Sequence, residues 1–158
     1  MIAVKPGFKL EPGDTVITGN WSNDLLLLMK AAGDSGLKAR FAAYWIDQPG
    51  NIANAGDTAI GHYTQSTYFP DANGAETEKF ALDFKEKTGN IPLNVQGHTV
   101  HGMWGLGEAL KGLKGKAGDK LSVKALAFSM EKVTIQTSMG PIKMRAEDHQ
   151  ALLPLAVA

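Results

Sequence analysis

The hydrophobic and polar positions in the first third of the chain follow a strand–helix–strand pattern. Residues 14–18 form a β-branched run that predicts a strand. Residues 24–32 place apolar side chains at helical spacing, and Ser22 or Asn23 is the predicted N-cap. Residues 38–45 predict a second strand. Because a helix connects the two strands, they are expected to be parallel.

Two longer helices are predicted in the middle of the chain, after a short helix at 52–55 and a strand at 60–68. Residues 75–88 are amphipathic and are followed by a glycine, which suits a helix end. Residues 94–113 repeat apolar side chains at helical spacing, although each of the four glycines weakens a helix by roughly 1 kcal/mol relative to alanine. The same glycines permit close packing of the backbone.

The last third of the chain is predicted to end in strands. Residues 122–127 suit a helix or a strand, and a helix is favoured. Residues 133–136 are β-prone, and residues 142–145 and 152–157 are predicted to form a terminal hairpin. A loop is expected at 112–119. The Pro-Gly pairs near the start of the chain predict turns, with at most a short strand in residues 2–4.

The composition excludes several classes of protein. Its 158 residues suffice for one ordinary domain with a core, and sixteen basic residues balance sixteen acidic ones, which argues against a nucleic-acid-binding surface. The absence of cysteine excludes disulfides, thiolate metal sites and a cysteine nucleophile. No apolar run approaches the roughly 20 residues of a membrane span. Residues 1–13 carry no signal-peptide pattern, so we expect a cytoplasmic protein or one whose leader has been replaced by a starting methionine.

The histidines raise two chemical alternatives to simple packing. His98 and His101 lie three residues apart on a predicted helix and could chelate a metal if Glu108 or Asp148 joined them. No acidic residue lies within one turn of the pair, so packing or ligand contact is favoured. An enzyme with His98, His101 or His149 as a base lacks an identifiable partner group, and no nucleophile elbow or phosphate loop is present. We expect neither catalysis nor a cofactor.

Aromatic and polar residues follow both predicted strands of the first third. Asn20 and Trp21 come after the first strand, and Tyr44, Trp45 and Asp47 come at the end of the second. Ligands of parallel α/β sheets bind beyond the carboxyl ends of the strands. Rings beside short polar groups suit a small ligand with an apolar body and a polar end. The alternative, that the two tryptophans pack in the core, carries about equal weight on this pattern.

Several motifs follow one another in a specific order: DTVITGNWSNDLLLLMKAA from Asp14 to Ala32, HGMWGLGEAL from His101 to Leu110, and MGPIKMRAEDHQ from Met139 to Gln150. In order and spacing they resemble the type I periplasmic solute-binding proteins of ABC importers, the family of the Leu/Ile/Val-binding proteins. No single motif is diagnostic, but together they are quite specific. The resemblance covers about residues 14–158.

The resemblance implies a partial α/β fold of the periplasmic-binding-protein type, with flavodoxin- or Rossmann-like βαβ layers and a C-terminal β-hairpin. It also implies two lobes joined by a hinge, and it marks the chain as the C-terminal fragment of a longer receptor. Residues 14–62 would belong to the second lobe. Residues 63–158 would supply helices and hinge strands of the first lobe, and residues 1–13 would be a linker or an N-terminal segment that does not match.

The same resemblance implies where a ligand would bind. The family places an aromatic residue after a strand of the second lobe, which Trp21 matches. It often places an acid at the end of the next strand, where Asp47 comes about two positions late. That displacement argues against an α-amino ligand and makes an aromatic or hydroxylated carboxylate plausible. A residue near Gln96 would face the cleft from the first lobe. The candidate ligand-binding residues are therefore Asn20, Trp21, Tyr44, Trp45, Asp47 and Gln96.

The implied function is the binding of a small carboxylate-bearing solute, an amino acid or an aromatic acid, in the periplasm, for delivery to the membrane subunits of an importer. The competing hypothesis is a truncated or engineered structural piece that self-associates and no longer binds ligand. The helices expected at 75–88 and 94–113 have apolar faces that this chain cannot fully cover. A homodimer or swapped oligomer is therefore expected to complete the fold.

Overall fold

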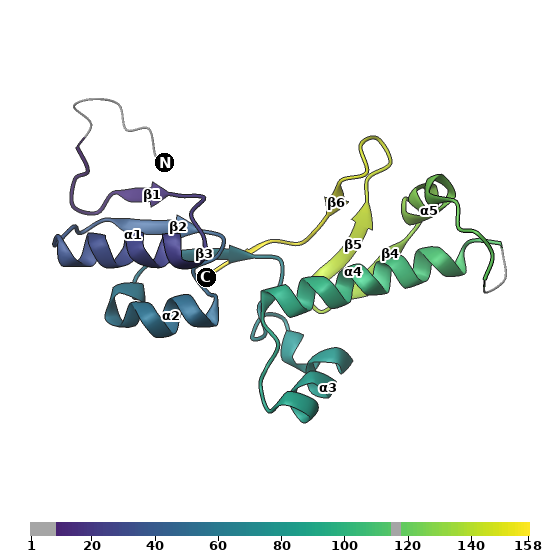
Figure 1. Ribbon diagram of the computed structural model, residues 1–158, viewed down its shortest axis with the longest axis horizontal. Coiled ribbons are helices and arrows are strands. Elements are labelled where there is room, and N and C mark those ends of the chain that lie inside the picture. Colours follow the sequence, from purple (N-terminus) through teal and green to yellow (C-terminus); the bar gives the residue numbers. More distant parts are fainter. Residues whose placement is uncertain (1–8, 115–117) are drawn as a thin grey trace. The chain divides into compact units, whose positions relative to one another are not determined.

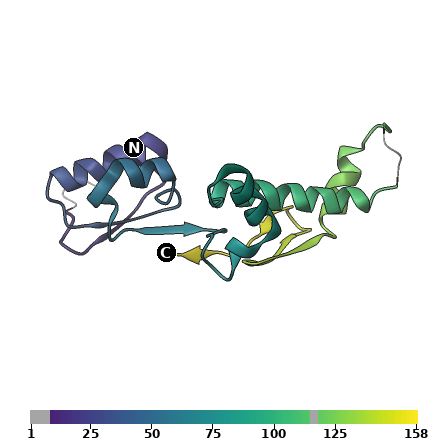
Figure 2. The same ribbon diagram turned by 90° about the horizontal axis from the view of Figure 1, so that it is seen from below.

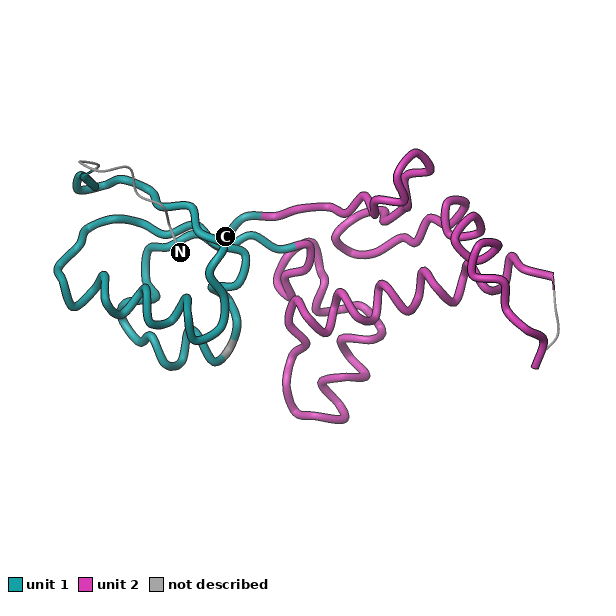
Figure 3. Tube along the Cα trace, turned by 45° about the horizontal axis from the view of Figure 1, so that its top comes forward, with its two compact units in different colours: residues 1–66, 157–158 teal, residues 67–156 magenta. Residues whose placement is uncertain are grey.

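The computed structural model describes residues 9–114 and 118–158, which form two compact units (Figure 3). Unit 1 contains the described residues up to Ser66 together with Val157–Ala158, and unit 2 contains Thr67–Ala156. The strand considered at 2–4 and the centre of the loop expected at 112–119 lie outside the described residues. None of the described helices combines the length and the apolar character needed to cross a membrane.

Unit 1 is built on a parallel sheet (Figure 1). Strand β2 pairs in parallel with β1 on one side and with β3 on the other, so the predicted βαβ unit is confirmed. A fourth strand, β7, lies beside β3. In chain order the elements are β1 (Thr15–Ile17), α1 (Ser22–Asp34), β2 (Arg40–Ala43), α2 (Pro49–Ala55), the 3-10 turn η1 (Gly56–Ala59), β3 (Tyr63–Ser66) and β7 (Ala156–Val157).

Helices α1 and α2 cover the same face of this sheet (Figure 2). Leu25 and Met29 of α1 are buried against Phe41 of β2. Successive strand residues point to opposite faces. Val16 of β1 accordingly packs against this core, whereas Ile17 points away from it and is 84% exposed. The second face of the sheet is left without a covering helix among the described residues of unit 1.

The start of helix α1 corrects the predicted N-cap. The helix begins at Ser22, so neither Ser22 nor Asn23 caps it, and Trp21 occupies the cap position without a side-chain bond. The side chain of Asn20 contacts the first turn in a different way, because its Nδ2 donates a hydrogen bond of 2.5 Å to the carboxylate of Asp24. This bond links the loop to the helix but satisfies no backbone amide, so it does not replace the predicted cap.

Unit 2 combines helices with an antiparallel sheet. Strand β5 pairs antiparallel with β4 and with β6. The helix favoured at 122–127 is confirmed, with Ser122 as its N-cap. In chain order the elements are the 3-10 turn η2 (Ala75–Thr77), α3 (Lys79–Thr88), α4 (Asn94–Lys111), α5 (Val123–Met130), β4 (Thr134–Thr137), β5 (Gly140–Met144) and β6 (Ala151–Leu152).

Two predictions for the second half of the chain are wrong in their extent. The helix expected across 75–88 breaks at Glu78, whose backbone is extended and whose carboxylate binds groups of other elements. The hairpin expected from 142–145 and 152–157 pairs only as far as Leu152. Pro154 has no backbone N–H to donate, and the residues after it leave this sheet to pair with β3.

Helix α4 packs closely on Tyr68 through Gly97. Tyr68 is fully buried, and its hydroxyl donates a hydrogen bond of 3.3 Å to the carbonyl oxygen of Ala75. A Cβ atom at position 97 would lie 2.4 Å from the Tyr68 ring. Gly97 weakens the helix through its backbone freedom. The close contact with Tyr68 nevertheless requires a residue without a Cβ atom at this position.

Replacing this glycine tests the contact. Gly97→Ala is expected to destabilise the protein by about 1–3 kcal/mol, because the ring and the helix must separate. Gly107→Ala, on the same helix, is the matched control, since a Cβ there meets no neighbour within 4 Å. The control is expected to stabilise the protein by up to about 1 kcal/mol. Urea denaturation measures both free energies, and equal effects at the two positions would contradict the close packing.

Candidate functional site

Five of the six predicted ligand-binding residues lie at one edge of the parallel sheet in unit 1. Asn20 and Trp21 follow β1, and Tyr44, Trp45 and Asp47 follow β2. The two strands are parallel and in register, so their carboxyl ends meet at the same edge. We call these five residues the strand-end cluster.

The loop after β1 is held at its base and presents an aromatic ring. The Oδ1 atom of Asn20 accepts a hydrogen bond from the hydroxyl of Thr18, and its Nδ2 donates to Asp24. The next residue, Trp21, is 63% exposed. The indole of Trp21 is therefore available to a ligand, and packing in the core does not account for it.

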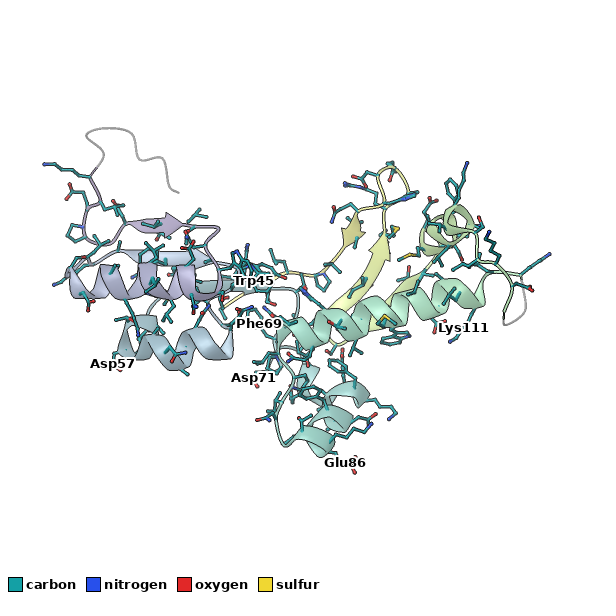
Figure 4. The ribbon with its side chains drawn as sticks, viewed as in Figure 1. Trp45, Asp57, Phe69, Asp71, Glu86 and Lys111 are labelled. Atoms are coloured by element: carbon teal, nitrogen blue, oxygen red, sulfur yellow. The ribbon has the colours of Figure 1, made fainter. Side chains whose placement is uncertain are left out.

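The segment after β2 carries a pair of aromatic rings. The centroids of Tyr44 and Trp45 lie 4.6 Å apart with an interplanar angle of 76°, an edge-to-face arrangement. Figure 4 labels Trp45 at this end of β2. The carbonyl oxygen of Trp45 accepts a hydrogen bond of 2.8 Å from the buried side chain of Asn51. Both rings are only half-buried, so this anchored pair keeps accessible surface.

Asp47 adds a carboxylate to the same edge. It is half-buried, and its Oδ1 atom accepts a hydrogen bond of 3.3 Å from the hydroxyl of Thr64 in β3. Burial raises the pKa of Asp47 above its ordinary value, against the opposing effect of this hydrogen bond. The ammonium group of a ligand would favour the charged form of this carboxylate. Asp47 can therefore accept a hydrogen bond from an ammonium or a hydroxyl group of a ligand.

Gln96, the sixth predicted residue, belongs to unit 2. Its side chain is exposed, and its Oε1 accepts a hydrogen bond of 3.1 Å from the backbone amide of Leu93 at the start of α4. A glutamine three residues into a helix often satisfies a free amide in this way. Gln96 thus caps the helix through its carbonyl oxygen.

The two histidines of α4 form polar contacts within unit 2. His101 is buried, with its Nε2 2.9 Å from Oε2 of Glu78. The other oxygen of Glu78 accepts bonds of 2.6 Å from both the backbone amide and the hydroxyl of Ser138. His98 is bonded to the hydroxyl of Thr67. In the described ranges no three His, Asp or Glu residues come together as metal ligands.

Glu78 ties the break before α3 to α4 and to the turn between β4 and β5. Burial raises the pKa of the Glu78 carboxyl, but the hydrogen bonds from Ser138 and His101 outweigh burial and hold the pKa below its ordinary value. Reasoning from the sequence missed this group. Nothing in the local pattern connects Glu78 with Ser138, which is 60 residues away.

Comparison with known proteins identifies the family. The sequence model of a family described as periplasmic binding protein matches residues 11–158. The chain belongs to the periplasmic binding protein family. Curated relatives from Brucella abortus and Brucella suis, both named Leu/Ile/Val-binding protein homolog 4, are 49% identical over 144 residues. Those residues are 91% of this periplasmic binding protein chain but 34% of each relative, so the chain spans about a third of their length.

Solved periplasmic binding proteins share the fold. The leucine-, isoleucine-, valine-, threonine- and alanine-binding protein of Brucella ovis, in its closed conformation, matches with 49% identity and a TM-score of 0.80. The match covers 91% of this chain and 37% of that one. An ABC-transporter solute-binding protein of R. palustris in complex with benzoate matches with 21% identity and a TM-score of 0.73 over 91% and 39% of the two chains. The predicted family and α/β fold class are confirmed.

The Glu78 carboxyl gives stability a defined pH dependence. Its pKa is lower in the folded protein, so its contribution is present above about pH 4.5 and is lost as the pH falls through the folded-state pKa. Glu78→Gln is expected to cost about 1–3 kcal/mol at neutral pH, because Ser138 loses a charged acceptor. The variant should also lose stability less steeply on acidification. Thermal denaturation across this pH range measures both effects.

Asp83→Asn is the control for this experiment. Asp83 lies on α3, where it accepts a bond of 2.6 Å from Lys79, a side chain that is 87% exposed. Exposed ion pairs contribute little to stability, so its removal should have a much smaller effect. A Glu78→Gln profile that follows the wild-type profile at every pH would contradict the anchoring role of Glu78.

Proposed function

We propose that this chain supplies one wall of the ligand site of an ABC-importer solute-binding protein. The ligand is a small carboxylate-bearing solute, an amino acid or an aromatic acid. The strand-end cluster carries the proposal, because it gathers aromatic and polar side chains where parallel α/β sheets bind ligands. Support comes from the names of the 49% identical relatives, which refer to leucine, isoleucine and valine.

Each residue of the strand-end cluster has a proposed role. The exposed indole of Trp21 and the pair of Tyr44 and Trp45 contact the apolar body of the solute. Asp47 accepts a hydrogen bond from its ammonium or hydroxyl group, and Asn20 holds the loop. The carboxylate of the solute is bound by a part of the longer relatives that this chain does not span, so the affinity of the chain alone is expected to be low.

The proposed setting is the periplasm, where the solute is handed to the membrane subunits of an importer. No chemical step is proposed. The names of the relatives describe binding proteins, which supports a role without catalysis.

A thermal-shift screen tests ligand binding. Branched-chain amino acids, aromatic amino acids and benzoate-type acids are the panel. A solute at a hundred times its dissociation constant stabilises the folded state by about 2.7 kcal/mol. Trp21→Ala should remove the shift while changing the free energy of unfolding little, since the side chain is 63% exposed. Trp104→Ala in α4 is the control and should keep the shift. A wild-type chain that melts cooperatively and shows no shift with any solute, even at concentrations that would saturate a millimolar site, would sink the proposal.

Asp47→Asn separates the two ligand classes. If the solute is an amino acid, loss of the carboxylate should weaken its binding about ten- to hundredfold, because a charged hydrogen bond to the ammonium is lost. Binding of benzoate, which has no ammonium, should stay unchanged. Asparagine can still accept the bond from Thr64, so the fold should be preserved. Equal affinity of both proteins for leucine would rule out the ammonium contact.

A second candidate function is self-association without ligand binding, and the uncovered face of the unit 1 sheet favours it. Ile17 and Tyr63 on this face are 84% and 41% exposed. Arg40 donates a hydrogen bond of 3.1 Å to the Tyr63 hydroxyl, so it shares the face. Exposed apolar surface promotes association. In this alternative a second copy covers the face, and the chain is a homodimer or a swapped oligomer.

Light scattering with two matched variants tests the alternative. Ile17→Lys should shift the chain towards the monomer, because a charge would be buried in the contact. Val123→Lys changes a residue of α5 that is 80% exposed and outside the sheet, and it should leave the assembly unchanged. A wild-type chain that is monodisperse and monomeric at micromolar concentrations would contradict self-association.

A further inference from the structure

The side chain of Asp47 is not fixed by the strand that precedes it. Strand β2 ends at Ala43, and residues 44–47 form a turn, so Asp47 lies four residues beyond the strand. The alternation of side chains between two faces holds within a strand, and it imposes no orientation on a residue of such a turn. The carboxylate therefore needs a second contact if it is to stay beside the end of β2.

Thr64 of β3 supplies this contact. It is paired with Ala43, the last residue of β2, so it lies level with the end of that strand. The hydroxyl of Thr64 donates a hydrogen bond of 3.3 Å to the Oδ1 atom of Asp47. The turn thus folds back towards the neighbouring strand, and the carboxylate lies beside the end of β2 although the sequence places it past that end.

The backbone of Thr64 is held on both sides. It pairs with Ala43 of β2 on one side. On the other side, its amide donates to the carbonyl oxygen of Ala158 and its carbonyl oxygen accepts from the amide of Ala158, both at 2.9 Å. A β-branched side chain has few rotamers available. The hydroxyl is therefore in place before a ligand binds, and it can orient the carboxylate without further ordering of the chain.

The hydrogen bond from Thr64 also affects the charge of Asp47. Both side chains are half-buried, and a hydrogen bond is stronger where water is partly excluded. Burial raises the pKa of Asp47, whereas the hydrogen bonds from Thr64 and from the backbone amide of Asp47 lower it. Thr64 thus favours the ionised carboxylate, which is the form that attracts an ammonium group.

We propose that Thr64 is a positioning residue of the ligand site, which holds the Asp47 carboxylate ready to bind the ammonium group of an amino acid. The inference rests on the proposed function and narrows its ligand class, because benzoate has no ammonium group for this carboxylate. The late position of Asp47 in the sequence, which argues against an α-amino ligand, is compensated by the contact with β3. A charged hydrogen bond is strong only when its donor and acceptor are aligned.

Titration of the Asp47 carboxyl by nuclear magnetic resonance, without ligand, tests the contact. Thr64→Val removes the hydroxyl and keeps the β-branched shape, so the pKa of Asp47 should rise further above its ordinary value. Thr64→Ser keeps a hydroxyl and should keep the wild-type pKa. Thr15→Val is the control, since Thr15 is exposed at the start of β1 in the same sheet. A change in the stability of a strand alone would not move the pKa of Asp47.

Titration of the same proteins with leucine and with benzoate, up to concentrations that saturate a millimolar site, tests the role in binding. Thr64→Val should weaken leucine binding about three- to tenfold, because the carboxylate loses the hydrogen bond that orients it. Benzoate binding should stay unchanged. Thr64→Ser and Thr15→Val should bind leucine like the wild type. Thr64→Ala removes the same hydroxyl from a smaller side chain and should repeat the loss, so the test does not depend on one variant.

The outcomes separate a failure of this inference from a failure of the proposed function. An unchanged pKa of Asp47 in Thr64→Val contradicts the contact, and equal leucine binding by that variant and the wild type contradicts the positioning role. Equal weakening of leucine and benzoate binding assigns Thr64 to the structure of the sheet instead. A wild-type chain that binds benzoate but not leucine overturns this inference alone, whereas one that binds neither overturns the proposed function as well.

Discussion

Parallel pairing of β1, β2 and β3 positions every group that the proposed function uses. Each parallel strand must be followed by a crossover to the opposite end of the sheet, so the strands all finish at one edge. The crossovers here are α1 and α2, and both pack on the same face. Leu25 and Phe41 hold this layer together, which leaves the loops after the strands free to carry Trp21 and Asp47.

Unit 2 depends on a different kind of contact. Glu78 lies at the break before α3 and binds His101 and Ser138, so one half-buried carboxylate joins elements that are far apart in the sequence. The glycines of α4 differ in what they do in this unit. Gly97 allows the ring of Tyr68 to approach the helix, whereas a Cβ atom at Gly105 would meet no neighbour within 4 Å. A residue type that weakens an isolated helix is thus required at one position by a packing contact.

The local pattern of apolar and polar residues predicts the helices and strands, but it does not predict the contacts that join them. The β-branched run at 14–18 and the spacing of apolar residues in α4 predict their elements because the signal lies within each segment. The break at Glu78 and the departure of the chain after Pro154 were not predicted, since each depends on partners distant in sequence.

The same distinction applies to the candidate site, whose residues were predicted from the sequence although their hydrogen bonds were not. The sequence predicts that aromatic and polar residues follow two strands, and the parallel sheet brings them to one edge. It does not show that Asn20 donates to Asp24, nor that Thr64 donates to Asp47, because these bonds depend on how the loops fold back. Trp21 could contact a ligand or pack in the core, and its exposure in the folded structure favours the first interpretation. That exposure cannot be read from the sequence.

Nuclear magnetic resonance of the indole N–H groups tests the central claim, that the strand-end cluster contacts a small carboxylate-bearing solute. The chain has three tryptophans, of which Trp21 and Trp45 lie in the cluster and Trp104 lies in α4. During titration with leucine or benzoate, the signals of Trp21 and Trp45 should shift along one saturation curve while that of Trp104 stays in place. Saturable shifts confined to Trp104, or none at any indole, would contradict the account.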